Sequence, residues 1–128
     1  SKIIASMGHR DLLTICDAGF PVPLEPERID LTVIEGIPMF MNVLKAIANE
    51  LQVEKIFIAK ETTEVSPKRY KEMKSLFPDV KVELIPHSEF MELSHKTRAT
   101  IRTAEFTSYS NIILKSGVIY LIMTCLPN

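Results

Sequence analysis

Short apolar runs of strand length alternate along this chain with segments of helical period, and this alternation restricts the fold more than any other feature. Residues 12–16 form a largely apolar, β-branched run closed by Asp-Ala-Gly, which is typical of a parallel strand covered on both faces. From residue 40 to residue 51, apolar side chains recur at steps of three and four, as in a helix with one buried face. Because alternating strands and helices build parallel sheets flanked by helices, the sequence predicts an α/β fold. The expected architecture is a three-layer α/β/α arrangement around an open, mainly parallel sheet.

The rest of the chain extends this pattern. Three prolines remove backbone donors from residues 20–26, so this stretch is expected to be an extended loop. Ser66 and Pro67 suit the N-cap and the first turn of a helix. The other predicted elements are strands over 28–34, 55–60, 80–85, 99–102 and 111–114, helices over 67–77 and from about residue 87, a turn at 115–117 and a closing apolar piece at 118–123. No linker or repeat divides the sequence, so residues 1–128 are expected to form a single domain.

Composition and motif content narrow the function classes. A formal net charge of −1 and a pI of about 6.3 provide no basic field for a phosphate backbone, so nucleic acid is not an expected partner. The longest apolar run, at 118–123, is too short to span a bilayer, which predicts no membrane partner and a cytoplasmic location. Cys16 and Cys125 lie outside any zinc-ligand spacing and are expected to be reduced and structural, so no metal is predicted. Neither a glycine-rich phosphate loop nor a Gly-x-Ser-x-Gly elbow is present, which disfavours nucleotide cofactors and acyl transfer.

His9 and Asp17 flank the first predicted strand and are the first candidates for chemistry. A carboxylate at the C-terminal end of a strand points toward the crevice where α/β proteins bind ligands, and a histidine titrates near neutral pH. Together they suggest proton transfer on a small polar molecule. Each residue also has a structural interpretation, because His9 fits a solvated turn and Asp17 can end its strand by accepting backbone N–H groups.

A second set of candidates follows later strands. His87 stands after the predicted strand at 80–85, and Tyr109, Ser110 and Asn111 form a loop before the strand at 111–114. Hydroxyl, amide and carboxylate groups suit a sugar, whose many hydroxyls each need a donor or an acceptor. On residue chemistry alone, a structural role is favoured for these residues too. His87 looks like a neighbour of a helix N-cap, and the loop has an ordinary turn composition.

Several blocks in a fixed order resemble the RbsD/FucU family of sugar mutarotases, over a stretch from His9 to about Tyr120. The blocks are Gly8-His9 with Asp11, Cys16-Asp17-Ala18-Gly19-Phe20-Pro21-Val22-Pro23, Arg28-Ile29-Asp30-Leu31, Pro86-His87-Ser88-Glu89, Ile101-Arg102-Thr103 with Glu105, and Tyr109-Ser110-Asn111-Ile112-Ile113-Leu114. The second and third blocks favour the D-ribose pyranase branch of the family over the L-fucose mutarotases.

This resemblance implies an isomerase without a cofactor that interconverts the β-pyranose and β-furanose forms of ribose and exchanges anomers. His9 takes the position of the catalytic histidine, while Asp17, His87, and the loop of Tyr109, Ser110 and Asn111 take substrate-binding positions. The resemblance also implies a homo-oligomer, an octamer or a decamer, with each site completed by a neighbouring subunit. Two alternatives remain open: an L-fucose-type mutarotase, and a non-enzymatic sugar-binding accessory of ribose transport.

The implied reaction agrees with the residue chemistry. Opening a cyclic hemiacetal removes a proton from the anomeric hydroxyl and delivers one to the ring oxygen, and a histidine can do either at neutral pH. Asp17 either holds His9 in one tautomer or binds a sugar hydroxyl.

The sequence departs from the family pattern in three places. Ala104 replaces a common glycine, which is expected to strain the loop if that position has a positive φ. Members of the family usually carry a further segment ahead of the Gly-His turn, so the resemblance implies that this chain is truncated or processed there. Residues 121–128 are expected to lie beyond the usual end of the family.

Overall fold

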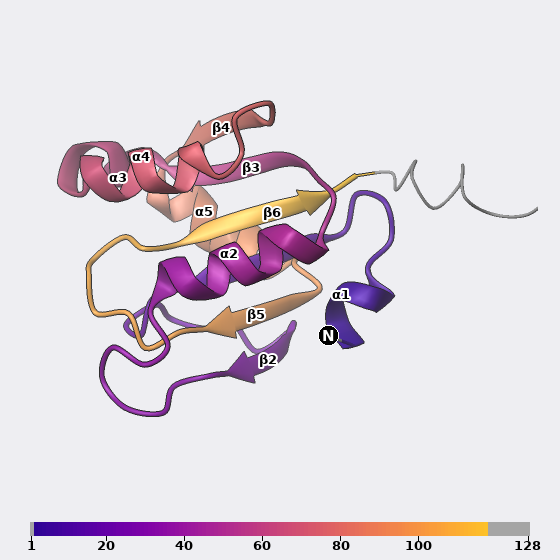
Figure 1. Ribbon diagram of the computed structural model, residues 1–128, viewed down its shortest axis with the longest axis horizontal. Helices are drawn as coiled ribbons and strands as arrows, with labels where there is room; N and C mark the ends of the chain where they lie inside the picture. The colour runs from indigo at the N-terminus through magenta and orange to yellow at the C-terminus, as the bar shows by residue number, and fades with distance from the viewer. Residues whose placement is uncertain (1, 118–128) are drawn as a thin grey trace, which may run out of the picture.

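A single six-stranded sheet organises the chain, and the strand order is β2-β5-β1-β6-β3-β4 (Figure 1). The computed structural model describes residues 2–117. The strands are β1 (Leu12–Cys16), β2 (Glu27–Asp30), β3 (Val53–Ala59), β4 (Lys81–Ile85), β5 (Ala99–Arg102) and β6 (Ile112–Ser116). The helices are α1 (Lys2–Ser6), α2 (Phe40–Glu50), α3 (Lys60–Val65), α4 (Pro67–Ser75) and α5 (His87–Ser94). None of the helices in this part of the chain is long and apolar enough to cross a membrane.

Strand direction determines which loops meet. β1 runs parallel to β5, β5 runs parallel to β2, and β3 runs parallel to β4. β6 is antiparallel to both of its neighbours, β1 and β3. Five strands therefore share one direction, and their carboxyl ends lie at the same edge of the sheet, which is also the edge where β6 begins. The predicted α/β fold with a mainly parallel sheet is confirmed.

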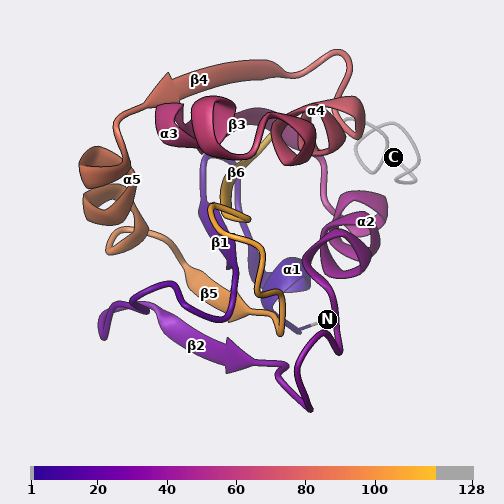
Figure 2. The same ribbon diagram turned by 90° about the vertical axis from the view of Figure 1, so that its left-hand side faces the viewer.

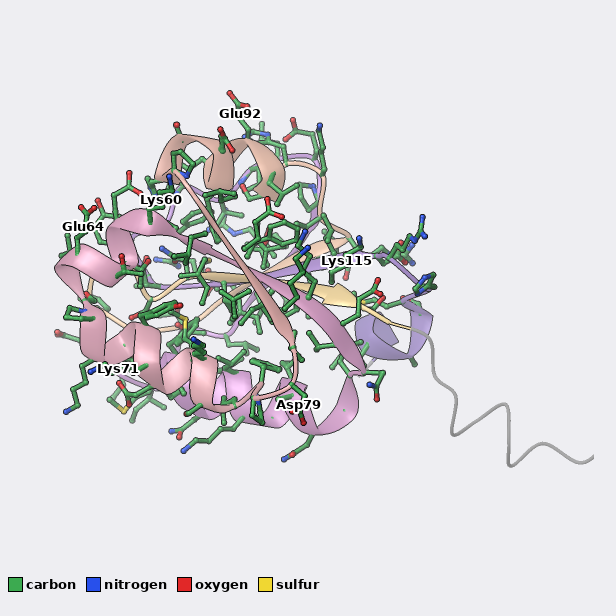
Figure 3. The ribbon with its side chains drawn as sticks, turned by 90° about the horizontal axis from the view of Figure 1, so that it is seen from above. Lys60, Glu64, Lys71, Asp79, Glu92 and Lys115 are labelled. Atoms are coloured by element: carbon green, nitrogen blue, oxygen red, sulfur yellow. The ribbon has the colours of Figure 1, made fainter. Side chains whose placement is uncertain are left out.

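Helices cover both faces of the sheet (Figure 2). On one face, α2 and α4 bury Phe40, Leu44 and Met73 in the larger hydrophobic cluster. On the other face, α5 contributes Phe90 to a smaller cluster that also holds Cys16. Burial raises the pKa of the Cys16 thiol to about 12, so this free cysteine stays protonated, as expected for a structural residue. The outer surfaces of α4 and α5 carry charged side chains such as Lys71 and Glu92 (Figure 3).

β6 shows why both faces need cover. Its side chains alternate, because Ile112 and Leu114 belong to the larger cluster while Ile113 belongs to the smaller one. All three are fully buried. A continuous apolar run therefore marks a strand that has a helical layer on each side.

Several predicted boundaries were wrong for local reasons. The strand predicted over 28–34 ends at Asp30, because the Asp30 carboxylate accepts the backbone N–H of Thr32 at 3.0 Å and turns the chain. Lys60 begins α3 instead of ending β3, and this short helix was missed because its two threonines and β-branched end have low helix propensity. β6 continues through Ser116, so no turn occurs at 115–116. The closing piece predicted at 118–123, together with Cys125, lies outside the described residues.

The strain expected at Ala104 does not arise. Among the described non-glycine residues, only Arg10 and Tyr109 have a positive φ. Ala104 is fully buried, its N–H donates to the Pro38 carbonyl and its own carbonyl accepts the Gly36 N–H, both at 2.9 Å. An alanine therefore fits this loop without a left-handed backbone.

Because β6 lies between β1 and β3, truncating one of its buried side chains should greatly reduce the stability of the fold. Leu114→Ala removes a fully buried side chain between β1 and β3, and we expect a loss of about 2–5 kcal/mol in the free energy of unfolding. Chemical denaturation at one fixed protein concentration measures this loss. Leu24→Ala is the matched control, because Leu24 is 94% exposed and its truncation should change stability by no more than about 0.5 kcal/mol. Equal effects of the two variants would contradict this account of the core.

Candidate functional site

A pocket of about 610 Å³ lies at the carboxyl edge of the sheet. Its walls come from the turn after β1, the start of α5, the end of β5 and the β5–β6 loop. The lining residues are Asp17, Ala18, Gly19, Phe20, Pro21, His87, Arg102, Glu105, Phe106, Ser108, Tyr109 and Asn111. Four of the residues proposed from the sequence, Asp17, His87, Tyr109 and Asn111, therefore meet in one pocket although they are far apart in the chain.

Asp17 is a buried carboxylate at the end of β1. Burial raises its pKa above the ordinary value, while backbone N–H groups of Ser110, Gly19 and Phe20 and the charge of His87 oppose that rise. The net direction is upward, so the ionised form costs the folded protein free energy. Such a carboxylate is poised to accept hydrogen bonds from a hydroxylated ligand, which would supply donors that burial has removed.

Asn111 joins the two walls of the pocket. Its Oδ1 accepts the backbone N–H of Asp17 at 2.9 Å. Because the partner is an N–H donor, this side-chain atom must be the amide oxygen, which leaves the amide NH₂ as a donor group in the pocket lining. Asp17 and Asn111 thus present an acceptor and a donor side by side.

Aromatic contacts hold His87 in place. Its ring stacks on Phe90 with a centroid distance of 6.4 Å and an interplanar angle of 7°, and the Tyr109 ring makes a T-shaped contact with it at a centroid distance of 5.3 Å. The backbone N–H of His87 donates to the Glu61 carboxylate of α3 at 3.0 Å. Its Nδ1 is buried without a hydrogen-bond partner among residues 2–117. Packing therefore fixes the orientation of this imidazole, and its Nδ1 makes no hydrogen bond to the described part of the chain.

Side-chain hydroxyl groups fix the loop before β6. Tyr109 has φ 59°, a left-handed conformation that is uncommon for a bulky residue and often found at functional sites. The Ser66 hydroxyl donates to the Ser108 carbonyl at 2.9 Å, and the Thr62 hydroxyl donates to the Tyr109 carbonyl at 3.4 Å. Ser66 was expected to cap α4 with its side chain, but the hydroxyl serves this loop and makes no cap hydrogen bond. Ser110 is fully buried and does not line the pocket.

His9 lies apart from these residues. His9 precedes β1, whereas Asp17 follows β1. The five residues of this strand alone span roughly 16 Å at about 3.3 Å per residue. The His9 side chain is 41% exposed, with Nδ1 4.0 Å from a Glu54 carboxylate oxygen, and it does not line the pocket. Asp17 therefore cannot orient His9 within one copy of the chain.

The turn that carries His9 is firmly built. The Gly8 N–H donates to the Asp11 carboxylate at 2.8 Å, and the Arg10 N–H donates to the Ser116 carbonyl at 2.9 Å. The Ser116 hydroxyl donates to the Gly8 carbonyl. Arg10 has φ 73°, so this turn also contains a left-handed residue. The imidazole is thus presented outward from a rigid base at the edge of the sheet opposite the pocket.

The pocket also contains residues that the site prediction omitted, among them Phe20, Arg102, Glu105 and Phe106. Arg102 ends β5, so its place at the carboxyl edge could have been inferred from strand direction. Its Nε donates to the Ala18 carbonyl at 3.0 Å and its Nη1 pairs with Asp30 at 2.9 Å. Nothing in the sequence alone marks Phe106, which stands 62% exposed at the pocket. Within the described part of the chain, no group of three or more histidine, cysteine or carboxylate side chains is arranged to hold a metal ion.

This fold and pocket define a small α/β protein with a pocket of polar and aromatic side chains at the carboxyl edge of its sheet, the edge where open α/β sheets bind ligands. A family model described as the RbsD / FucU transport protein family matches residues 1–119. A D-ribose pyranase of Clostridium perfringens is 50% identical over 120 residues, which cover 94% of this chain and 92% of that protein. The chain belongs to the RbsD/FucU family.

Solved structures agree with this assignment. Bacillus subtilis RbsD complexed with D-ribose matches with a TM-score of 0.90 and 40% identity, covering 92% of this chain and 90% of that chain. A fucose mutarotase of Streptococcus pneumoniae in complex with L-fucose matches with a TM-score of 0.76 at 23% identity, covering 92% and 90% of the two chains. The second likeness shows the shared fold.

The buried Asp17 carboxylate predicts a pH-dependent stability difference. Its pKa is raised in the folded state, so the folded protein holds this proton more tightly and loses stability as the pH rises through that folded pKa. Asp17→Asn removes this loss. We expect the variant to be more stable than wild type at neutral pH, by a margin that shrinks as the pH falls toward the ordinary value of 3.8. Thermal unfolding across this pH range measures the margin.

Asp79→Asn provides the control, because it removes the same charge at an exposed position of the surface (Figure 3). A wild-type protein that is more stable than Asp17→Asn at neutral pH would show that the backbone donors outweigh burial.

Proposed function

We propose that this protein is a D-ribose pyranase, an isomerase that interconverts the pyranose and furanose forms of ribose and acts in the cytoplasm. The observation that carries the proposal is the meeting of Asp17, His87, Tyr109 and Asn111 in one pocket, in a chain 40% identical to RbsD complexed with D-ribose. Acceptor, donor and aromatic groups converge there, which is the chemistry that a hydroxyl-rich ring with apolar C–H faces requires.

Each pocket group has a role in this proposal. The Asp17 carboxylate accepts hydrogen bonds from sugar hydroxyls, and the Asn111 NH₂ donates one. The rings of His87 and Tyr109 pack against the sugar and fix its orientation. Ser110 contributes through its backbone N–H, which bonds the Asp17 carboxylate and holds it in place.

The proposed chemical step is acid and base catalysis by His9. A base takes the proton of the anomeric hydroxyl while an acid protonates the ring oxygen, the ring opens, and another hydroxyl closes on the carbonyl carbon by the reverse transfers. Positioned acid or base catalysis contributes roughly 10² to 10⁴ in rate, which is substantial for a reaction that already proceeds in water.

The position of His9 implies a shared site. His9 projects from the sheet edge opposite the pocket of its own chain, so we propose that the imidazole reaches the pocket of a second copy in a homo-oligomer, an octamer or a decamer. Each subunit then supplies a binding pocket to one site and a catalytic histidine to another.

We predict that His9→Ala folds normally and loses the catalysed exchange. The expected decrease in rate is roughly 10² to 10⁴, because only the acid and base contribution is removed. Magnetisation-transfer NMR on ribose measures the exchange between ring forms. His95→Ala is the matched control, since His95 is an exposed histidine that pairs with Glu25 and does not line the pocket. Wild-type exchange rates in the His9 variant would overturn the assigned role.

The same experiment separates the alternatives. Faster exchange of fucose than of ribose by wild type would favour a fucose-type mutarotase. Ribose binding with exchange at the buffer rate would favour a non-enzymatic accessory of transport, which the description of the matching family also suggests.

We further predict that two inactive variants complement each other. Mixed oligomers of His9→Ala and Asn111→Ala chains contain sites in which an intact histidine meets an intact pocket. Random mixing in equal amounts should restore roughly a quarter of the wild-type exchange rate. Subunits are mixed by co-expression, and the exchange rate is compared with that of each variant alone. A mixture as inactive as its components would show that each site belongs to one chain.

A further inference from the structure

Glu105 connects both walls of the pocket to the rest of the fold. Its backbone carbonyl accepts the N–H of Ala18, next to Asp17, at 2.8 Å. One carboxylate oxygen, Oε2, accepts the N–H of Thr107 in the β5–β6 loop at 3.3 Å. The other, Oε1, accepts the N–H of Phe40 at the start of α2 at 3.2 Å. A single buried residue thus fixes the turn after β1, the β5–β6 loop and the first turn of a helix relative to one another.

Arg69 of α4 stands behind this carboxylate. Its Nη2 lies 3.4 Å from Glu105 Oε1, and the two side chains are only 12% and 6% exposed. The guanidinium also lies over the Phe40 ring, 5.7 Å from its centroid. Arg69 does not line the pocket, but its ion-pair partner Glu105 does, so this pair links Arg69 to the pocket wall.

The pair is poorly arranged as a source of stability. A buried ion pair loses hydration on both sides, and replacing it by apolar residues is often neutral or favourable. The contact here is long, and the Arg69 Nε is buried without a partner in the described part of the chain. Burial alone would raise the pKa of Glu105, but hydrogen bonds from Thr107 and Phe40 and the charge of Arg69 lower it overall. The carboxylate therefore stays ionised, with each oxygen already bonded to the protein.

We propose, on the basis of the pyranase function above, that Arg69 is a positioning residue for sugar recognition. Through its ion pair with Glu105, Arg69 holds the loop that carries Tyr109 and Asn111 against the Asp17 turn, and so sets the affinity for the sugar. Glu105 transmits this constraint, because its carboxylate bonds the loop and its carbonyl bonds the Asp17 turn.

This role predicts a particular kinetic pattern. In the proposed function, Tyr109 and Asn111 bind the sugar equally in the ground state and in the transition state. His9 transfers the proton, and it is held by a different turn at the opposite edge of the sheet. Loosening the loop therefore removes uniform binding, which raises KM with little change in kcat. Arg69→Met keeps much of the packing over Phe40 and removes the charge that faces Glu105. We expect a rise of roughly tenfold or more in the ribose concentration that half-saturates the exchange, since small displacements of binding groups are costly.

The experiment compares four variants of the full chain by magnetisation-transfer NMR over a range of ribose concentrations. Arg69→Lys retains the cation and should recover most of the affinity. Lys71→Met removes a cation from the solvent side of the same helix and should match wild type (Figure 3). The double variant Arg69→Met with Glu105→Gln removes both charges, and its single amide oxygen cannot accept the N–H groups of both Thr107 and Phe40, so it should not regain affinity.

Hydrogen exchange of the protein without sugar gives a second readout. The amides of Thr107 and Ser110 should exchange faster in Arg69→Met than in wild type, because their acceptors lose a fixed position. An unchanged KM in a folded Arg69→Met variant, or a double variant that recovers affinity, would overturn the proposal. Failure of Arg69→Lys to recover any affinity would overturn it as well.

The outcome for the pyranase function is read separately from wild type. If wild type binds ribose without exchanging it, the pyranase function fails, and the dissociation constants of the same four variants decide the role of Arg69. If wild type neither binds nor exchanges ribose, both proposals fail, whatever the hydrogen exchange of the loop shows.

Discussion

The reversed direction of β6 is the constraint on which the pocket depends. β6 is antiparallel to β1, so its first residues lie beside the last residues of β1 at the carboxyl edge of the sheet. This neighbourhood lets the Asn111 side chain accept the backbone N–H of Asp17. It also means that the connection from β5 to β6 never leaves that edge and forms a wall of the pocket. A parallel strand in the same place would begin at the far edge and would carry Asn111 away from Asp17.

The same sheet separates binding from the proposed acid and base. The two ends of β1 face in opposite directions, one toward the pocket and the other toward the rigid turn of His9. The proposed site shared between copies would resolve this separation, because the exposed imidazole of one subunit would then complete the pocket of another. The proposed division of labour also explains why the pocket is lined by binding groups of fixed orientation, and why the histidine it contains, His87, is held by aromatic packing.

Sequence reasoning reached the fold because its strongest signals were a continuous run of strand length and a segment of helical period. The continuous apolar run at 12–16 and the three- and four-residue steps from Phe40 correspond to β1 and α2. Boundaries failed where side chains decide the backbone, as at Asp30, where the carboxylate bonds Thr32 and ends β2. The residues of the pocket walls could be inferred only in part. Asp17 and Arg102 end parallel strands, so strand direction places them at one edge, whereas Glu105 and Arg69 meet through a tertiary contact that no spacing in the sequence reveals.

At Tyr109, the conformation of the backbone and the contacts of the side chain favour different residues. Its left-handed backbone is a conformation in which glycine or asparagine is far more comfortable, so either replacement would relieve local strain. The same replacement would remove the ring that makes a T-shaped contact with His87. Any programme of directed evolution that rewards thermal tolerance alone will therefore tend to erase this aromatic surface. A lineage that must keep sugar recognition has to tolerate the strained tyrosine and compensate for it elsewhere in its core.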